Sequence, residues 1–187
     1  LKKKLEPHKE KKVHLVKKPE FTEQDLYHHQ LKVIEDWERA SNTGLVRHAT
    51  GSGKTFTALF ALKRHFKKHS CALILVPSLA LHRQWLREIK KIIPDATTLS
   101  VSSKNQVWRK DGNLRRFTKE SENEKNRKNI LVAVNNSART EKFLSNLSNN
   151  NHLFVIADEV HNLGSRENSK IFGIQTDVKM GLIFHKI

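Results

Sequence analysis

Three almost unbroken aliphatic runs constrain the fold more than any other feature of the chain. They are "CALILVP" at 71–77, "NILVAVN" at 129–135 and "HLFVIADEVH" at 152–161. A strand that is buried on both faces reads in this way, because neither side of it meets water. Helical patterns separate the runs. This alternation predicts an α/β domain with a mostly parallel sheet and helices on both of its faces.

Weaker patterns fill in the remaining elements. Segments 43–49 and 96–101 are short strand candidates, and 137–147 is a short helix candidate. Residues 102–128 are polar and basic without a clear period, so we expect a long surface insertion there. Three further segments show helical spacing of apolar residues. These residues are Tyr27, Leu31, Ile34 and Trp37, with Thr22 or Asp25 as caps; Ala58, Leu59, Leu62 and Phe66; and Leu81, Trp85, Ile89 and Ile92.

Composition narrows the class of protein. The 187 residues are 37% hydrophobic, which is enough for a core, and the net charge is +16 with a pI of 10.1. Such a charge favours a polyanionic partner, most plausibly nucleic acid, with an anionic membrane surface as the alternative. No apolar run approaches the roughly 20 residues that span a bilayer, and no signal peptide is visible. The single cysteine, Cys71, has no partner for an internal disulfide, so we expect a cytoplasmic protein.

Residues 50–55, "TGSGKT", have the composition of a phosphate-binding loop. Gly51 and Gly53 allow a tight turn whose amides point at phosphate oxygens, with the start of the next helix behind them. Lys54 would reach the terminal phosphates, and the Thr55 hydroxyl would bind Mg²⁺. The strict pattern begins with glycine where this chain has His48. An ordinary strand-to-helix turn is the alternative.

Two adjacent acids, Asp158 and Glu159, end the last aliphatic run. Ligands of open α/β sheets bind at the carboxyl ends of the strands, so these acids belong at the same edge as the loop. We expect Asp158 to hold magnesium and Glu159 to orient and deprotonate the attacking water. A solvated helix start is the alternative for an isolated acid pair.

Taken in order, these segments resemble a known family. "HATGSGKT", "LILVPSLALHRQW" and "IADEVHNLGS" are similar to motifs I, Ia and II of superfamily 2 helicases and translocases, on the DEAH-like side. "LYHHQLKVIEDW" and "VAVNNSAR" resemble the segment before motif I and motif Ib. The nearest resemblance is to the type III restriction subunit (ResIII) group, and it covers about residues 21–182. It implies a RecA-like P-loop NTPase domain that uses ATP and Mg²⁺ to move on nucleic acid, most plausibly double-stranded DNA.

The resemblance also implies residue roles. Gln30 would recognise the adenine edge, and His161 would couple the nucleotide site to the nucleic-acid site. The phosphates and magnesium would be held by Thr50, Gly51, Ser52, Gly53, Lys54 and Thr55. Nucleic acid would lie near Pro77, Ser78, Asn136 and Ser137. Structural alternatives remain for these four, because proline ends strands and serine caps helices.

The resemblance breaks near the end of the sequence. Motif III of the family reads close to Gly-Leu-Ser-Ala-Thr-Pro, whereas this chain reads "VKMGL" at 178–182 and then "IFHKI". We therefore expect a basic arm or linker at 1–20, an ATP-binding RecA-like domain at 21–182 and an aberrant tail at 183–187. In the family a second RecA-like domain supplies catalytic arginines. Without it, the chain is expected to bind ATP–Mg weakly and to hydrolyse it very slowly.

Two other functional hypotheses remain open from the sequence. The chain could be a non-catalytic nucleic-acid-binding module on a nucleotide-binding scaffold, or a remnant that does not fold stably. The intact protein could have a nuclease or methylase partner, and no membrane partner is expected. Two groups of basic residues could track phosphates or could simply be solvated. They are Lys63, Arg64, Lys67 and Lys68, and Arg109, Lys110, Arg115 and Arg116.

Overall fold

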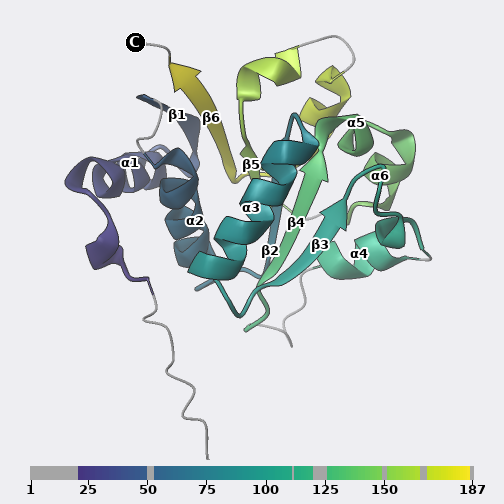
Figure 1. The fold of residues 1–187 in the computed structure, drawn as a ribbon, viewed down its shortest axis with the longest axis horizontal. Coiled ribbons are helices and arrows are strands. Elements are labelled where there is room, and N and C mark those ends of the chain that lie inside the picture. The colour runs from purple at the N-terminus through teal and green to yellow at the C-terminus, as the bar shows by residue number, and fades with distance from the viewer. Residues whose placement is uncertain are drawn as a thin grey trace, which may run out of the picture.

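A six-stranded sheet forms the centre of the molecule (Figure 1). The computed structural model describes residues 21–49, 53–110, 112–119, 126–148, 151–164 and 168–185. Every pairing in the sheet is parallel, and the strand order is β1-β6-β5-β2-β4-β3. The predicted fold class is therefore confirmed.

The strands are short and the longer helices lie between them. The strands are β1 (Thr43–Ala49), β2 (Cys71–Val76), β3 (Thr97–Val101), β4 (Asn129–Val134), β5 (Phe154–Ala157) and β6 (Lys179–His185). The α-helices are α1 (His28–Arg39), α2 (Lys54–His65), α3 (Leu79–Ile92), α4 (Asn113–Thr118), α5 (Asn135–Ala138) and α6 (Glu141–Asn146). The 3-10 turns are η1 (Glu23–Asp25), η2 (Val107–Arg109), η4 (Val160–Gly164) and η5 (Ser169–Gly173). None of the described helices is long and apolar enough to cross a membrane.

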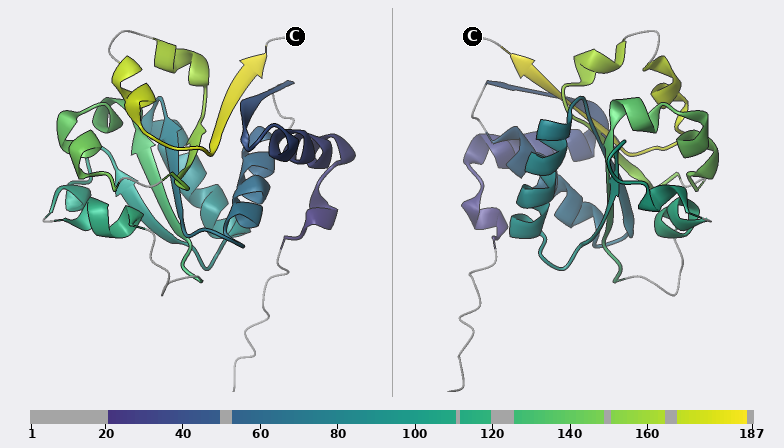
Figure 2. Two further views of the ribbon diagram at one scale, coloured as in Figure 1. Left: turned by 180° about the vertical axis from the view of Figure 1, so that it is seen from behind. Right: turned by 45° about the vertical axis from the view of Figure 1, so that its right-hand side comes forward.

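The direction of the chain through the sheet decides which face each helix covers. From β1 to β2 and from β2 to β3 the chain moves one way along the sheet, and from β3 through β4 and β5 to β6 it moves back. Because parallel crossovers are right-handed, reversing direction places the connections on the opposite face. Accordingly, α1, α2 and α3 cover one face, and η2, α4, α5, α6, η4 and η5 cover the other (Figure 2).

Alternating strand residues fill two separate cores. Ala72, Ile74 and Val76 of β2 pack under the helices of the first face, whereas Cys71, Leu73 and Leu75 pack under the second. In β5, Phe154 and Ile156 belong to the first core and Val155 and Ala157 to the second. This two-sided burial explains the continuous aliphatic runs.

The structure corrects the interpretation of residues 102–128 as a surface insertion. Trp108 and Leu114 are 2% and 1% exposed, and both belong to the second core. The rings of Trp108 and Phe143 are 5.8 Å apart, edge to face. Only a few apolar residues anchor this segment, so no helical or strand period reveals its burial. Part of the segment therefore closes the second face of the sheet.

Two smaller boundaries also differ from the sequence interpretation. The expected helix at 137–147 is two short helices, α5 and α6, and the Thr140 hydroxyl caps α6 by accepting from the Phe143 N–H. The expected caps Thr22 and Asp25 belong to η1 and not to α1, which begins after Tyr27. Tyr27 is 71% exposed, so it lies outside the apolar face of α1.

Candidate nucleotide site

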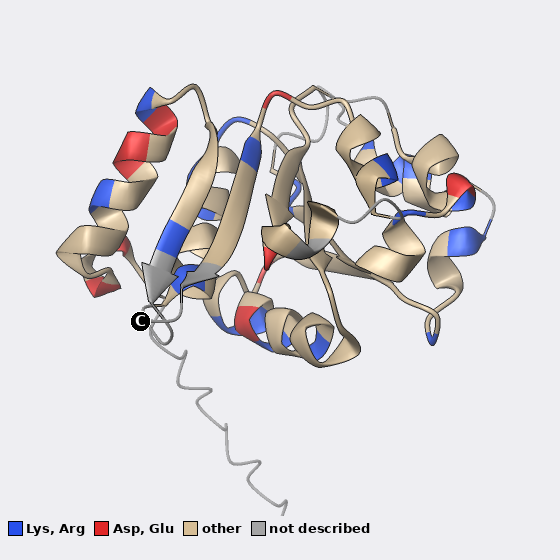
Figure 3. Ribbon diagram, turned by 90° about the horizontal axis from the view of Figure 1, so that it is seen from above, with Lys and Arg blue, Asp and Glu red and all other residues tan. Residues whose placement is uncertain are grey.

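The carboxyl edge of the sheet gathers most of the predicted site residues. In register, Val76 pairs with Val134 and Leu75 pairs with Ala157, so β2, β4 and β5 end side by side. Pro77, Asn135 and Asp158 directly follow these strands. Figure 3 looks onto the side of the molecule at which the strands end. The sequence interpretation placed Asp158 at this edge from the last aliphatic run, and the family resemblance added Pro77 and the residues after Asn135.

The amino end of α2 lies at this same edge. Gly53 precedes the helix with φ 78° and ψ 31°, the left-handed region, which favours glycine. Its carbonyl accepts from the Thr57 N–H at 2.9 Å and from the Thr57 hydroxyl at 3.1 Å. Lys54 and Thr55 therefore begin the helix, where a phosphate would meet its positive end. The predicted loop residues Thr50, Gly51 and Ser52 lie outside the described residues.

Gln30 lies directly against this turn. A Cβ atom on Gly53 would overlap Nε2 of Gln30, so the backbone of residue 53 and the amide of Gln30 are in close contact. Gln30 is 2% exposed, and its Oε1 accepts from the Tyr27 N–H at 2.9 Å. The side chain thus caps α1 and reaches the start of α2 at the same time. Its predicted role toward adenine stays a prediction.

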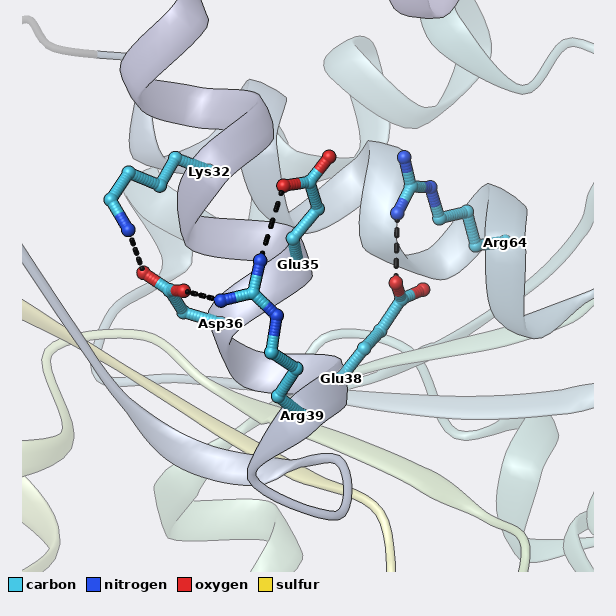
Figure 4. Close-up of polar contacts among 6 residues, drawn as sticks. All are labelled: Lys32, Glu35, Asp36, Glu38, Arg39 and Arg64. Atoms are coloured by element: carbon cyan, nitrogen blue, oxygen red, sulfur yellow. Dashed lines mark hydrogen bonds and ion pairs between the residues drawn. The ribbon is translucent and has the colours of Figure 1, made fainter.

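Ion pairs fasten α1 to α2 and so hold Gln30 in place. Arg64 of α2 donates to Glu38 of α1 at 2.8 Å (Figure 4). It also donates to both carboxylate oxygens of Glu23 in η1, at 2.8 and 2.9 Å. The hydrogen bond from Arg64 lowers the pKa of Glu23 below its ordinary value. The hydrogen bond to Glu23 also raises the pKa of Arg64. Arg64, suggested by the sequence as a phosphate contact, is therefore engaged within the protein.

Asp158 is turned toward the first face of the sheet. Alternation along β5 assigns it to the side of Phe154 and Ile156, which is the side of α2 and α3. Its side chain accepts a hydrogen bond from Nε1 of Trp85 at 2.8 Å, and the residue is 7% exposed. Burial raises the pKa of the Asp158 carboxyl, although the Trp85 hydrogen bond, the Glu159 backbone N–H and the Lys54 charge each act to lower it.

Lys54 and Asp158 therefore share one electrostatic environment at this edge. Among the described residues, no group of three or more His, Cys, Asp and Glu could hold a metal by itself. One carboxylate and one hydroxyl, those of Asp158 and Thr55, fit Mg²⁺, which uses one or two protein oxygens and completes its shell with waters and substrate phosphates. Asp158 and the Thr55 hydroxyl would be the protein oxygens, with Lys54 beside the phosphates.

Glu159 has an unusual backbone. Its φ is 52°, in the left-handed region that costs a residue with a Cβ roughly 1–2 kcal/mol. This turn breaks the strand alternation and separates Glu159 from Asp158. The Glu159 carboxylate is 20% exposed and lies 3.4 Å from Nδ1 of His161, whose side chain is 56% exposed. Strain of this kind is concentrated at functional sites.

Replacing Glu159 with glycine tests this strain. Glycine adopts the left-handed region freely, so Glu159→Gly should raise the free energy of unfolding by about 0.5–1 kcal/mol. Glu159→Ala keeps a Cβ and should bring no such gain, which makes it the matched control. Urea unfolding of the three chains measures the difference. Equal stability of the glycine and alanine variants would contradict the prediction.

The four residues predicted near nucleic acid have mixed placements. β2 ends just before Pro77, and the Ser78 hydroxyl caps α3 by accepting from the Leu81 N–H at 3.3 Å. Asn136 is exposed. Ser137 is 6% exposed and lies within α5, so it is not the helix N-cap that its type suggested. The strand-ending alternative thus holds for Pro77, and the helix-cap alternative fails for Ser137.

Charge is distributed unevenly over the molecule. Acidic residues gather along α1, where Glu35 and Asp36 pair with Arg39, whereas the α4 side carries mainly basic residues (Figure 3). There, Arg109, Lys110, Arg115 and Arg116 are all exposed. Arg109 stacks on the Trp108 ring at 4.9 Å, and Arg115 donates to the Ser145 carbonyl at 3.1 Å.

Sequence reasoning assigned Trp85 to the core and missed its contact with Asp158. The ring is indeed fully buried, at 0% exposure, which confirms the packing expectation. Its helical spacing with Ile89 and Ile92 predicts that burial but contains no sign of a polar partner 73 residues away. A signal was available, since buried indole N–H groups usually find an acceptor.

The six-stranded parallel sheet with helices on both faces, the glycine-led helix and the acid at the end of β5 belong to a RecA-like P-loop NTPase fold. Residues 23–182 match the family model "Type III restriction enzyme, res subunit". Because that match spans most of the chain, the protein belongs to this family. It corresponds to a first RecA-like domain of superfamily 2, as the resemblance implied. A comparison with curated proteins found no match.

Solved structures show the same fold. The SWI2/SNF2 ATPase core of Sulfolobus solfataricus in complex with dsDNA aligns with a TM-score of 0.60 and 15% identity, over 89% of this chain and 33% of that one. The type ISP restriction-modification enzyme LlaBIII bound to DNA gives 0.63 and 18%, over 84% and 12%. The UvsW helicase of bacteriophage T4 gives 0.59 and 15%, over 84% and 51%. The chain thus spans about half or less of each.

Proposed function

We propose that this chain is the ATP-binding core of a DNA helicase or translocase of the restriction type, on the DEAH-like side of superfamily 2. One observation carries the proposal. The charge of Lys54, at the amino end of α2, acts to lower the pKa of the buried Asp158 at the carboxyl end of β5, and Gly53 beside Lys54 lies against Gln30. A triphosphate with Mg²⁺ needs this combination of a helix start, a lysine and an acid.

The chain's residues divide the chemistry among them. The amides before α2 and the Lys54 ammonium would bind phosphate oxygens, and Thr55 and Asp158 would hold Mg²⁺. The ion neutralises charge on the transferred phosphoryl group. Glu159 would accept a proton from the attacking water. The nearby His161 would couple the nucleotide site to the nucleic-acid site. Gln30 would select the adenine base.

Nucleic acid would lie across the carboxyl edge, near Pro77, Ser78 and Asn136. The net charge of +16 favours such a polyanionic partner. We also propose a basic arm at 1–20 and an ATP-binding domain at 21–182. Residues 183–185, which the sequence interpretation assigned to an aberrant tail, continue β6 and pair with β1. Movement on DNA would need a second RecA-like domain, and a nuclease or methylase is a candidate partner of the intact protein.

Lys54→Ala tests the proposal against its alternative, a nucleic-acid-binding module without a nucleotide. The variant removes charge-assisted hydrogen bonds to phosphate worth about 2 kcal/mol, so ATP–Mg should bind about 30-fold more weakly. Isothermal titration calorimetry measures the affinity. Lys68→Ala removes an exposed lysine in the turn that follows the far end of the same helix, and this variant should bind like the wild type. Wild-type protein that binds DNA but no ATP–Mg would favour the alternative.

A further inference from the structure

The single hydrogen bond between Trp85 and Asp158 joins two segments that have separate roles. Trp85 belongs to α3, seven residues after its cap Ser78, and Asp158 ends β5. The Nε1–Oδ2 distance is 2.8 Å, and neither residue is more than 7% exposed. Because the bond is buried, a water molecule cannot readily replace the indole N–H as the hydrogen-bond donor to Asp158.

The indole suits this task chemically. It donates one hydrogen bond and cannot accept one or lose its proton near neutral pH, so its partner oxygen must remain an acceptor. The ring around the N–H is fixed by the first core, where Ile89 and Ile92 lie on the same helix. Because the indole ring is packed in place, its N–H holds the Asp158 carboxylate in one orientation. A hydrogen bond that orients a metal-ligating side chain in this way raises its affinity for the metal.

We propose that Trp85 is a positioning residue for the nucleotide site, because its indole N–H orients the Asp158 carboxylate toward Mg²⁺. The inference rests on the proposed function, since it takes Asp158 as the metal-binding acid. Trp85 itself touches neither nucleotide nor metal. Its effect should therefore appear in the magnesium dependence of nucleotide binding and not in binding of the nucleotide alone.

The chain offers a matched control for this bond. Trp37 is also buried in the first core, at 6% exposure, and its Nε1 donates to the Lys179 carbonyl at 2.9 Å. Trp85→Phe and Trp37→Phe each keep an aromatic ring and remove one indole donor. Both should lower the melting temperature to a similar extent. Only the first removes a donor from a group of the nucleotide site.

The decisive measurement is a Mg²⁺ titration of fluorescent ATP binding to the full chain. Trp85→Phe should raise the Mg²⁺ midpoint about tenfold, as expected for losing one hydrogen bond to a charged acceptor. Its affinity for ATP in EDTA should equal that of the wild type, and Trp37→Phe should change neither value. An unchanged midpoint in Trp85→Phe would overturn the inference while leaving the proposed function intact. Wild-type protein that binds no ATP–Mg would overturn both.

A second measurement needs neither nucleotide nor a stable Trp85 variant. The indole N–H signals can be assigned by NMR in the wild-type chain, and Asp158→Ala removes the acceptor. The Trp85 signal should then move upfield, while those of Trp37 and Trp108 stay in place. A Trp85 signal that does not respond would show that the hydrogen bond is absent in solution, and the positioning role would fall with it.

Discussion

Replacing Gly53 with alanine should lower the free energy of unfolding by about 2–5 kcal/mol and abolish measurable ATP–Mg binding. Two costs add. Residue 53 has φ 78°, where a Cβ is strained by roughly 1–2 kcal/mol. The new Cβ would also overlap Nε2 of Gln30, and relieving such a clash in a packed site costs typically 1–3 kcal/mol. The overlap can be relieved by a shift of the Gln30 amide or by a shift of the backbone at residue 53. Both groups belong to the proposed nucleotide site.

Gly112 separates the two costs. It too has a left-handed backbone, with φ 65°, but nothing lies within 4 Å of a Cβ built there. Gly112→Ala should therefore cost only the backbone strain. Gln30→Ala in the Gly53→Ala background should restore part of the stability, because it removes the overlapping amide. Equal losses for Gly53→Ala and Gly112→Ala in urea unfolding would show that the contact with Gln30 has no energetic weight.

The sequence predicted the sheet well because burial on both faces leaves an unmistakable pattern. β2, β4 and β5 were all identified from continuous aliphatic runs, and their alternation with helices indicated the α/β class. The edge at which Lys54 and Asp158 meet followed from the same reasoning, since parallel strands end together. These inferences need only local composition and one topological rule.

What the sequence did not reveal depends on contacts between distant segments. Trp108 and Leu114 are isolated members of the second core, and no periodic apolar pattern around them predicts their burial. The bond from Trp85 to Asp158 spans 73 residues, and the contact of Gln30 with Gly53 depends on how α1 packs on α2. The left-handed backbone of Glu159 is likewise a property of the folded edge, because glutamate itself does not favour it.

Acid should destabilise the protein through His65, at the opposite end of α2 from the nucleotide site. His65 is 9% exposed, and burial lowers its pKa from 6.5 to about 3, with the charges of His69 and His152 acting in the same direction. The His65 ring lies 4.9 Å from that of His69, which stacks on His152 at 4.3 Å. His65 and His69 line a pocket together with Glu38, Arg64, Lys67 and Lys68.

The direction in which pH changes the free energy of unfolding depends on whether the folded or the unfolded chain takes up the proton. Above pH 6.5 His65 is neutral in both states and adds no pH dependence, whereas below it the unfolded chain binds a proton that the folded chain excludes. Stability should therefore fall by about 2.3 kcal/mol between pH 6.5 and 4.5 from this residue, as the slope rises from half to nearly all of about 1.36 kcal/mol per pH unit. His65→Gln, neutral throughout, should lose that slope in urea unfolding. His28→Gln, at an exposed histidine, should keep it.

The general repulsion of a chain with net charge +16 affects all three proteins alike and cancels in the comparison. Parallel pH profiles for wild type and His65→Gln would mean that His65 accepts its proton in the folded state, so that its burial costs nothing in acid.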